Sequence, residues 1–476
     1  MSIAFLLLPD ASLHPQTLVT FATLMSGVTG ELNLKVAINS RQVLKIAMPI
    51  AVSILIPQVN FITNNIFLSA LGEQTLGVAG ITGVFYLVFA VIGFGLNNGL
   101  QALIARRAGQ ERLHEIGNLF NQGVRITLGF AALSILLTYF VAPVIFRHSL
   151  HHPQDIEMAT SFLRIRIWGL PFLYVYQMRN ALLVGINQSK YLVYGTLVET
   201  VSNIILDYAF IYGNFGFPQM GFNGAAYASV IAEALGLLVT FAVMHLSGVT
   251  KKIALLNNIK YDQATVKLIL TQSAPLILQY AISIVSWEFF FILIEHHGKR
   301  DLAISNIMRN VFGLFGCVSW SFAATSNTMI SNIIGQGLQE RVTELILRIM
   351  KLSVSFALFI FITLNLKPDL LLQVYGQNSD FIQAAIPVVR VVSAALVLQS
   401  VSTVWLNAVV GTGNSRINLY TETGAIILYC IYNYIMLEVL KLSIVVGWAS
   451  EWLYWISLFI PSFFYIKSGR WKNKVI

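Results

Sequence analysis

The second half of this chain repeats the first half at one constant offset in residue number. The correspondence extends over most of each half, so it reflects one structural unit used twice. In an apolar chain, such a duplication is typical of a transporter with two lobes and a binding site between them. The corresponding pairs, whose numbers always differ by 226, include Pro49 and Pro275, Gly72 and Gly298, Gly109 and Gly335, Arg164 and Arg390, and Tyr208 and Tyr434.

Composition places these two lobes in a membrane. Of the 476 residues, 56% are hydrophobic and only 11% are charged, and no water-soluble domain could bury that many apolar side chains. Residues 46–70 and 77–104 contain no Asp, Glu, Lys or Arg, and a helix needs roughly 20 apolar residues to cross the hydrocarbon core. We expect twelve spans, near residues 46–70, 77–104, 121–146, 161–185, 191–213, 222–247, 264–294, 302–332, 349–365, 382–410, 417–438 and 443–466.

The predicted fold is all-α, a polytopic membrane protein with two six-helix repeats. Because six is even, both repeats enter the bilayer from the same side and are parallel. Gly95 and Gly99, four residues apart in the second span, predict either a close approach by a neighbouring helix or, with Gly93, a local bend. The expected parts are a tail at 1–42, with Met25 as an alternative start, an N-lobe at 43–247, a linker at 248–263, a C-lobe at 264–466 and a basic tail at 467–476.

The distribution of basic residues predicts the orientation. By the positive-inside rule, both termini are expected in the cytoplasm and the protein in the inner, or cell, membrane. The net charge of +9 then reflects topology and anionic lipids, and no nucleic-acid partner is expected. The basic residues of the expected cytoplasmic side are Lys35, Arg41, Lys45, Arg106, Arg107, Arg112, Lys251, Lys252, Lys260, Lys467, Arg470, Lys472 and Lys474.

The sequence contains no signature of hydrolytic or nucleotide chemistry. A phosphate-binding loop, a His-Glu-x-x-His zinc motif and a Gly-x-Ser-x-Gly nucleophile motif are all absent, so we expect no enzyme and no cofactor. His148, His151 and His152 are expected in a solvated outer loop and not at a metal, because no acid or cysteine completes a ligand set. Cys317 and Cys430 lie in apolar spans. A monomer is expected.

Ionisable groups inside the spans are the main functional candidates, because burying them in a bilayer is costly. Asn203 and Asp207 are four residues apart and share one helix face. Asn180, Asn64 with Asn65, and Ser229, from three other spans, could converge on that face. A carboxylate with amide and hydroxyl oxygens suits either a proton or Na⁺, the latter held by Asp207, Asn203 and Asn180. The alternative is that Asp207 ties helices together or pairs with Arg179.

A second candidate lies in the seventh span. The Glu288 carboxylate could be the counter-charge of a lipophilic organic cation, with Trp287 and Tyr280 as its aromatic surface. The alternative is an acid paired structurally with Arg309. Glu288 is expected to be the best-placed acid of the C-lobe core, and Glu199, Glu233 and Glu422 are expected to be structural.

Several motifs resemble those of the multidrug and toxic compound extrusion family. The sequence Asn-Ile-Ile-Leu-Asp-Tyr at 203–208, followed by 213–218 and by Gly-Phe-Asn-Gly-Ala-Ala-Tyr-Ala-Ser at 221–229, is similar to its fifth-to-sixth helix signature. Ala-Arg-Arg-Ala-Gly-Gln at 105–110 resembles its first cytoplasmic loop. The resemblance covers roughly residues 40–465. It implies twelve-helix antiporters with two lobes in a V, which expel organic cations in exchange for H⁺ or Na⁺.

The resemblance also implies site residues. It places an ion site in the N-lobe at Asp207 and Asn203 with Asn180 and Ser229, and it puts Glu288 at the seventh-helix acid of some members. Two positions depart from the family, since Asn64 replaces a first-helix Asp and Gln399 replaces a tenth-helix acid.

The leading interpretation is a secondary active antiporter that exports organic cations, drugs or related metabolites by alternating access. Its coupling ion would be H⁺ or Na⁺, at Asp207, Asn203, Asn180, Ser229, Asn64 and Glu288, and its substrate would meet Glu288, Trp287, Tyr280 and Gln399. The alternatives are a flippase for lipids or lipid-linked oligosaccharides, and a non-transporting membrane sensor or scaffold.

Overall fold

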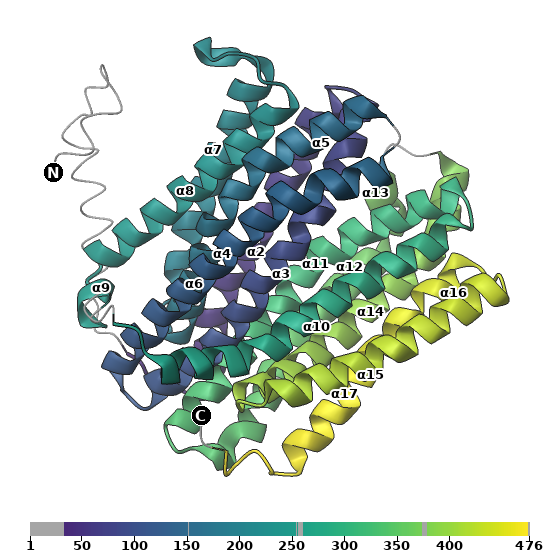
Figure 1. Cartoon of the computed structure of the whole chain (residues 1–476). Coiled ribbons are helices and arrows are strands. Elements are labelled where there is room, and N and C mark those ends of the chain that lie inside the picture. Colours follow the sequence, from purple (N-terminus) through teal and green to yellow (C-terminus); the bar gives the residue numbers. More distant parts are fainter. Residues whose placement is uncertain (1–32, 151, 254, 256–259, 374–377, 475–476) are drawn as a thin grey trace, which may run out of the picture.

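The computed structural model describes residues 33–150, 152–253, 255, 260–373 and 378–474, and within these the ordered elements are all helical. His151, most of the N-terminal tail including Met25, and part of the linker lie outside the described residues. In Figure 1 the N-terminal half, in purple and blue, forms one bundle beside the green and yellow bundle of the C-terminal half. This is the predicted two-lobed, all-α architecture.

The N-terminal half contributes six spans. They are α2 (Ser40–Ser69), α3 (Glu73–Gly109), α4 (Leu113–Ser149), a fourth span in which η1 (Ile167–Gly169) joins α5 (Pro153–Arg166) to α6 (Leu170–Gly185), α7 (Leu192–Tyr212) and α8 (Phe222–Leu246). The short elements η2 (Ser189–Tyr191), η3 (Asn214–Gly216) and α9 (Val249–Lys252) lie between or after them.

The C-terminal half repeats this arrangement. Its spans are α10 (Gln263–Glu295), α11 (Lys299–Gly335), α12 (Val342–Leu366), α14 (Ser379–Gly411), α15 (Ser415–Asn433) with the π-helical turn η5 (Tyr434–Val439), and α16 (Ile444–Trp448) continued by α17 (Ser450–Lys467); η4 (Gln339–Arg341) and α13 (Pro368–Gln373) are short. Both bounds of α11 follow those of α3 by the offset found in the sequence, so the repeat of the sequence is a repeat of the structure.

Nine helices of the described chain are long and apolar enough to cross a membrane by length and composition. The remaining three spans are the fourth, which η1 interrupts, and α7 and α15, which carry Glu199, Asp207 and Glu422 within short helices. These three are therefore the more polar spans of a multi-pass membrane protein. The predicted count of twelve spans agrees with this architecture.

Local signals in the sequence fix several helix starts. Gly72 and Gly298, a repeat-related pair, precede α3 and α11 with φ of 107° and 116°, which residues with a Cβ rarely adopt. Asp262 caps α10 by accepting from the backbone N–H groups of Ala264 and Thr265. Hydrogen bonds from the Thr265 and Asn118 side chains help to hold the pKa of Asp262 below its ordinary value. The Asn118 contact also ties the start of the C-lobe to α4.

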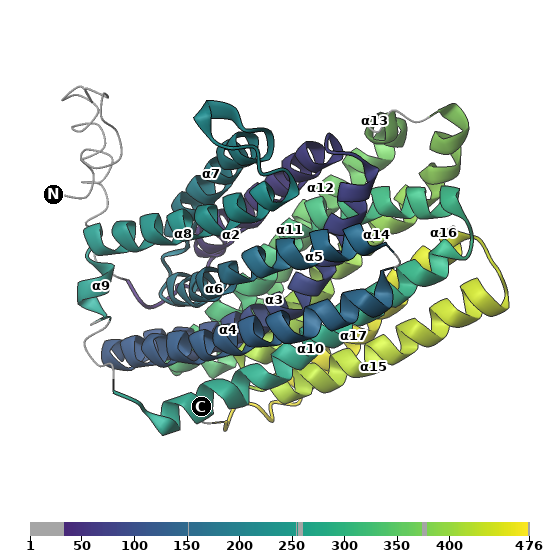
Figure 2. The same ribbon diagram turned by 45° about the horizontal axis from the view of Figure 1, so that its top comes forward.

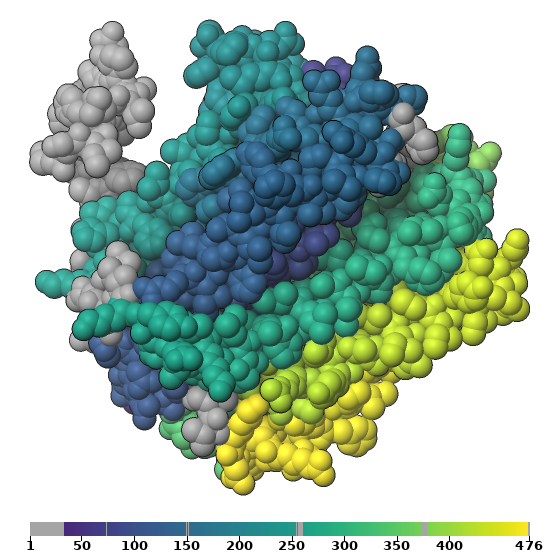
Figure 3. All heavy atoms as spheres, in the orientation of Figure 1, coloured from purple at the N-terminus to yellow at the C-terminus, as the bar shows by residue number. Residues whose placement is uncertain are grey.

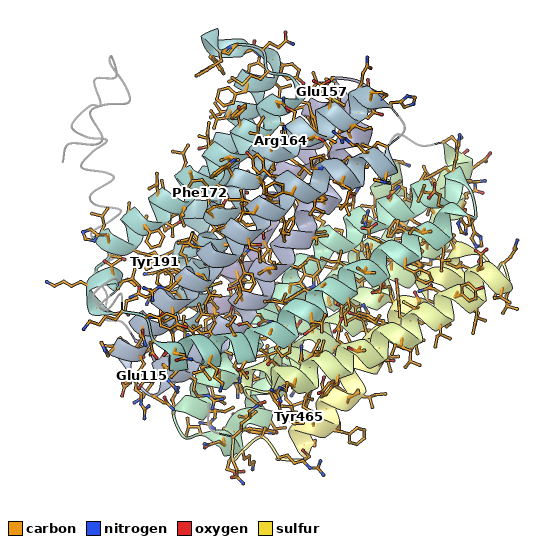
Figure 4. All side chains as sticks on the ribbon, in the orientation of Figure 1. Glu115, Glu157, Arg164, Phe172, Tyr191 and Tyr465 are labelled. Carbon is orange, nitrogen blue, oxygen red and sulfur yellow. The ribbon has the colours of Figure 1, made fainter. Side chains whose placement is uncertain are left out.

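Among the described residues, the largest apolar cluster joins the two lobes at one end. One buried cluster contains Ile46 and Leu100 of the N-lobe together with Met329 and Val409 of the C-lobe. Two other large clusters belong to a single lobe each, one around Phe146 in the N-lobe and one around Phe290 in the C-lobe. The shared end is the one where α3 and α11 finish. Figure 4 shows Glu115 and Tyr465 towards this end and Glu157 towards the opposite one.

Close backbone contacts at the shared end involve α3. A Cβ added to Gly95 would come within 2.5 Å of the Ile277 backbone nitrogen, and one added to Gly99 would meet Ser273. The predicted close approach at these glycines is confirmed, and the neighbouring helix is α10 of the other lobe. Figure 2, turned from the first view, shows α3 between the lobes, and Figure 3 shows the blue and green halves meeting along a seam.

Hydrogen bonds reinforce this end. Gln101 Nε2 donates to Thr328 Oγ1 at 2.7 Å, and the buried Arg106 donates through Nη2 to the carbonyl oxygen of Gly411 at 3.1 Å. All four residues lie near the ends of their helices on the side that the basic loops mark as cytoplasmic. The lobes are therefore held together on that side.

Candidate cation and substrate sites

Asp207 is a buried carboxylate in the last part of α7 in the N-lobe. Its side chain has no exposed surface, and neither Oδ1 nor Oδ2 has a hydrogen-bond partner among the described residues. An ionised carboxylate in such a place costs several kilocalories per mole unless a proton or a bound cation neutralises it. The site therefore has the chemistry of a cation acceptor.

Asn203, one turn before Asp207 on α7, connects three helices. Asn60 of α2 donates through Nδ2 to Asn203 Oδ1 at 2.7 Å, and Asn203 Nδ2 donates to Ser229 Oγ of α8 at 3.5 Å. The predicted meeting of Asn203 and Ser229 is present in the structure. Asn60 was not predicted, although it precedes Asn64 by four residues, which is the spacing that singled out Asn203 and Asp207.

Asn64 lies one turn beyond Asn60 on α2, as Asp207 lies one turn beyond Asn203 on α7. The two helices pack together and run in the same direction, so Asn64 and Asp207 lie at about the same level. Asn64 Oδ1 is buried and, within the described chain, has no hydrogen-bond partner either. Four buried oxygens without a partner among the described residues, one each of Asn60 and Asn64 and two of Asp207, thus lie on the paired helices α2 and α7.

Asn180 takes part in a different cluster. Its Oδ1 accepts from Arg179 Nη2 at 2.6 Å, and Arg179 donates through Nη1 to Thr240 Oγ1 while its guanidinium lies 3.8 Å from the Tyr176 ring centroid. No hydrogen bond joins Asn180 to Asp207 in the described chain. Because Arg179 is directed to Thr240 and Asn180, the structure also does not show it as the ion-pair partner of Asp207.

Glu233 forms a buried ion pair that the sequence did not reveal. Arg166 donates through Nη2 and Nη1 to the two carboxylate oxygens of Glu233, at 2.6 and 3.1 Å, and its guanidinium lies 4.0 Å from the Tyr86 ring centroid. Gly169 leaves room for both side chains, since a Cβ there would collide with them. The partner comes from another helix, which spacing along α8 alone does not show. The pair agrees with the structural role predicted for Glu233.

Glu288 also has a partner. Arg309 Nη2 donates to Glu288 Oε1 at 2.6 Å, and the two side chains are 35% and 40% exposed, in the order Glu288 and Arg309. The Arg309 guanidinium lies 4.3 Å from the Phe291 ring centroid. This is the pairing given as the alternative for Glu288 from the sequence. A substrate cation would have to share Glu288 with Arg309 or displace Arg309 from it.

The other predicted substrate residues lie apart from one another. Trp287 packs among Phe291, Phe312 and Trp448, with ring centroids 5.8 to 6.0 Å away. The Tyr280 hydroxyl lies at the lobe interface and accepts from Asn98 Nδ2 at 3.5 Å. Among the described residues, no hydrogen bond or ring contact joins either of them to Gln399.

Gln399 itself is fully buried in α14. Its amide nitrogen and oxygen both lack a hydrogen-bond partner within the described chain. Gly316 of α11 lies close to both amide atoms, because a Cβ there would come within 3.4 Å of Oε1 and 3.6 Å of Nε2. The Gln399 side chain is therefore an unsatisfied polar group between α14 and α11. Unsatisfied polar groups of this kind are available to bind a ligand.

The expectation that Glu288 is the best-placed acid of the C-lobe core is wrong. Glu422 and Glu451 are 2% and 1% exposed, far more buried than the Glu288 side chain. Glu422 accepts from Ser283 Oγ at 2.7 Å, from Gln279 Nε2 at 3.2 Å and from the Tyr454 hydroxyl. The sequence placed Glu422 near a helix end, but burial depends on which face packs inward, and that face is set by neighbouring helices.

The repeat in this structure also matches a known family. The family model described as MatE matches residues 49–209 and 275–435, two segments related by the offset of the repeat that together make up more than half of the chain. The chain belongs to the MatE family. The resemblance stated from the sequence motifs is thereby confirmed.

Relatives and solved structures agree with this MatE assignment. The chain is 21% identical over 399 residues to the probable multidrug resistance protein NorM of Synechocystis sp., covering 81% of this chain and 85% of that protein. It is 25% identical over 282 residues to the probable multidrug resistance protein YoeA of Bacillus subtilis, covering 56% of this chain and 59% of that protein. An outward-facing structure of a multidrug resistance MATE family transporter superposes with a TM-score of 0.83 at 17% identity, covering 93% of this chain and 97% of that one.

A second solved structure extends the comparison of folds. A transporter of the MOP superfamily from Pyrococcus furiosus, described as having a binding pocket of reversed polarity, superposes with a TM-score of 0.82 at 16% identity and covers 95% of this chain and 99% of that one. Similarity at this level shows the shared fold. The function of this MatE protein must be argued from its own buried groups.

Proposed function

We propose that this MatE protein is a secondary active antiporter that exports lipophilic organic cations, drugs or related metabolites in exchange for H⁺ or Na⁺. The observation that carries the proposal is Asp207, a fully buried carboxylate whose two oxygens have no hydrogen-bond partner among the described residues. The names of the relatives, probable multidrug resistance proteins, support the substrate class. The protein is proposed to lie in the cell membrane as a monomer, with both termini in the cytoplasm.

Asp207 supplies what an antiporter needs, a group whose charge changes between two states. With a cation bound, the site is electrically neutral and tolerates burial; without one, the bare carboxylate favours a conformation that admits water or another cation. Asn203, Ser229 and Asn64 are proposed to contribute oxygens to the same site, from the helix of Asp207 and from the two helices packed against it. A difference in cation affinity between two lobe arrangements then couples the cation to the movement of substrate.

Glu288 is proposed to contribute on the substrate side. Ion pairs exposed to the degree of Glu288 and Arg309 contribute about 0–1 kcal/mol, so an organic cation could replace Arg309 at little cost. The aromatic residues around Trp287 offer an apolar surface beside it. Tyr280 and Gln399 are proposed to meet the substrate only when the lobes rearrange, because they lie at a lobe interface and in a helix interior.

Flux in proteoliposomes tests the proposal. A fluorescent lipophilic cation is presented under an imposed H⁺ gradient and, separately, an imposed Na⁺ gradient. We expect uphill movement with one of the two, and loss of it in Asp207→Asn. Glu157→Gln, which removes an exposed carboxylate of α5, is the matched control and should behave like wild type. Wild-type flux that ignores both gradients, in correctly inserted protein, would contradict the proposal.

A further inference from the structure

The repeat assigns C-lobe counterparts to Asn203, Asp207 and Ser229 of the N-lobe cation site. With the offset of 226, Asn203 corresponds to Tyr429 and Asp207 to Asn433, both on α15. On the last span, the counterpart of Ser229 is Trp455. The C-lobe position has therefore lost the carboxylate of α7. It has gained another, since the counterpart of Ala225 is Glu451, in the first turn of α17.

These counterparts are buried and unsatisfied, as Asp207 is. Glu451, Asn433 and Tyr429 are 1%, 0% and 3% exposed. Glu451 Oε2, both amide atoms of Asn433 and the Tyr429 hydroxyl lack hydrogen-bond partners in the described part of the chain, as do Trp455 Nε1 and Ser450 Oγ. Buried polar groups nearly always have partners, so this concentration of unsatisfied atoms on two adjacent helices marks the group as a candidate site.

The Glu451 carboxylate lies at the centre of this group. The Tyr429 hydroxyl and the Trp455 indole N–H both act on it from close range, although neither meets hydrogen-bond geometry, and Ser450 lies beside the same hydroxyl. Asn433 follows Tyr429 by one turn on the same face of α15. Aromatic rings enclose the site, with the centroid of Phe290 5.9 Å from that of Tyr429.

Among the described residues, no salt bridge joins Glu451 to an Arg, Lys or His side chain, and the side chains beside its carboxylate are Tyr429 and Trp455. Tyr454, its neighbour on α17, directs its hydroxyl to Glu422, whose carboxylate is already satisfied by Ser283 and Gln279. Within the described chain, Glu451 is thus a single buried acid without a counter-charge.

The surrounding groups suit a proton. When Glu451 is ionised, the O–H of Tyr429 and the N–H of Trp455 can donate to it; when Glu451 is protonated, its own O–H can donate to the oxygen of Tyr429, whose hydroxyl can then turn to Ser450. A Na⁺ ion would face the indole N–H, which is a donor only and cannot serve as a ligand. Both protonation states can therefore be stabilised by modest side-chain adjustments.

We propose that Glu451 is a second proton-binding site, the C-lobe counterpart of the Asp207 site, with its carboxylate supplied by α17 instead of α15. Its part in coupling rests on the proposed antiport function, whereas proton binding itself does not. The protein would then carry one exchangeable cation in each lobe.

Infrared difference spectroscopy of the purified full-length protein tests this directly. The C=O stretch of protonated carboxyl groups is followed through a pH titration across the neutral range. We expect wild type to show a component that Glu451→Gln lacks, and Glu157→Gln to retain it. The double variant Glu451→Ala with Asn433→Asp copies the N-lobe pair Ala225 and Asp207 into the C-lobe, and it should restore a titrating component.

The outcomes separate this proposal from the function proposed above. If wild type shows no transport but has a titrating carboxyl component that Glu451→Gln lacks, the result would support the proton site and contradict the proposed antiport function. An unchanged titration in folded Glu451→Gln, with the folding checked by thermal unfolding, would overturn the proton site even if transport is normal. Repeating the titration in Na⁺ and in choline distinguishes the occupant, because displacement of the component by Na⁺ would contradict a proton site.

Discussion

Gly109→Ala is expected to loosen the contact that holds the lobes together at the end where α3 and α11 finish. A Cβ at Gly109 would collide with the carbonyl oxygen of Asn332, and one at its repeat-related partner Gly335 would collide with the carbonyl oxygen of Arg106. Both obstacles are backbone atoms within helices, so they cannot turn away as a flexible side chain could. The substitution must therefore separate the ends of α3 and α11 or strain them.

The size of the effect follows from the packing. Overfilling a well-packed interface costs about 1–3 kcal/mol. Because the cost falls only on the arrangement in which α3 and α11 touch, it shifts the balance towards a separated arrangement by roughly 5- to 150-fold. Gly80→Ala on the same helix is the matched control, since a Cβ there would meet no atom within 4 Å.

Distances between spin labels at Arg112 and Glu340, both exposed near the ends of α3 and α11, measure this shift. Wild type and Gly80→Ala should give the same short distance, and Gly109→Ala should add a longer one at the expense of the short one. An unchanged distance distribution in folded Gly109→Ala would refute the idea that this contact controls how the lobes meet.

Three further predictions concern topology, ion pairs and a helix cap. In sealed cells a membrane-impermeant thiol reagent should label Gln219→Cys from outside and leave Arg112→Cys unlabelled, and the reverse pattern would show that the orientation is wrong. Glu233→Gln should lower the free energy of unfolding by about 3–5 kcal/mol, because the substitution leaves Arg166 buried without its partner. Glu288→Gln should change the free energy of unfolding by no more than about 1 kcal/mol, because the pair of Glu288 with Arg309 is half exposed. Equal losses of the two variants in thermal unfolding would contradict the difference in burial. Asp262→Ala should destabilise the protein by about 1 kcal/mol at neutral pH through loss of the helix cap. Because hydrogen bonds lower the pKa of Asp262 in the folded protein, its contribution to stability is present above the ordinary Asp pKa and is lost as the pH falls through the lowered pKa. Wild type and Asp262→Ala should therefore have the same stability in acid, and a stability difference that persists there would contradict the role of the charge.

The sequence predicted the features that depend on periodicity. Apolar runs and the constant offset between the halves gave the helices and the relation between α3 and α11, and the spacing of Asn203 and Asp207 gave one face of a site. These properties are local to a helix or repeat along the chain. They do not require knowledge of how helices rotate against each other.

The spacing of residues along the sequence could not predict contacts between helices. Arg166 and Glu233 meet from α5 and α8, and Asn60 reaches Asn203 from α2, because neighbouring helices happen to present those faces to one another. Glu451 was missed for a related reason. Its importance appears only when it is compared with its N-lobe counterpart Ala225: the N-lobe site has its carboxylate on α7, whereas the C-lobe has one on α17.

Substrate-driven release of cations from purified protein tests the role of Asp207 most directly. A fluorescent lipophilic cation is added to weakly buffered wild-type and Asp207→Asn protein, and released H⁺ and Na⁺ are measured alongside binding of the probe. Asp207→Asn is expected to bind the probe and to release fewer cations per molecule bound than wild type. Equal release from the two proteins, both folded, would show that the buried carboxylate of Asp207 does not carry the exchanged cation.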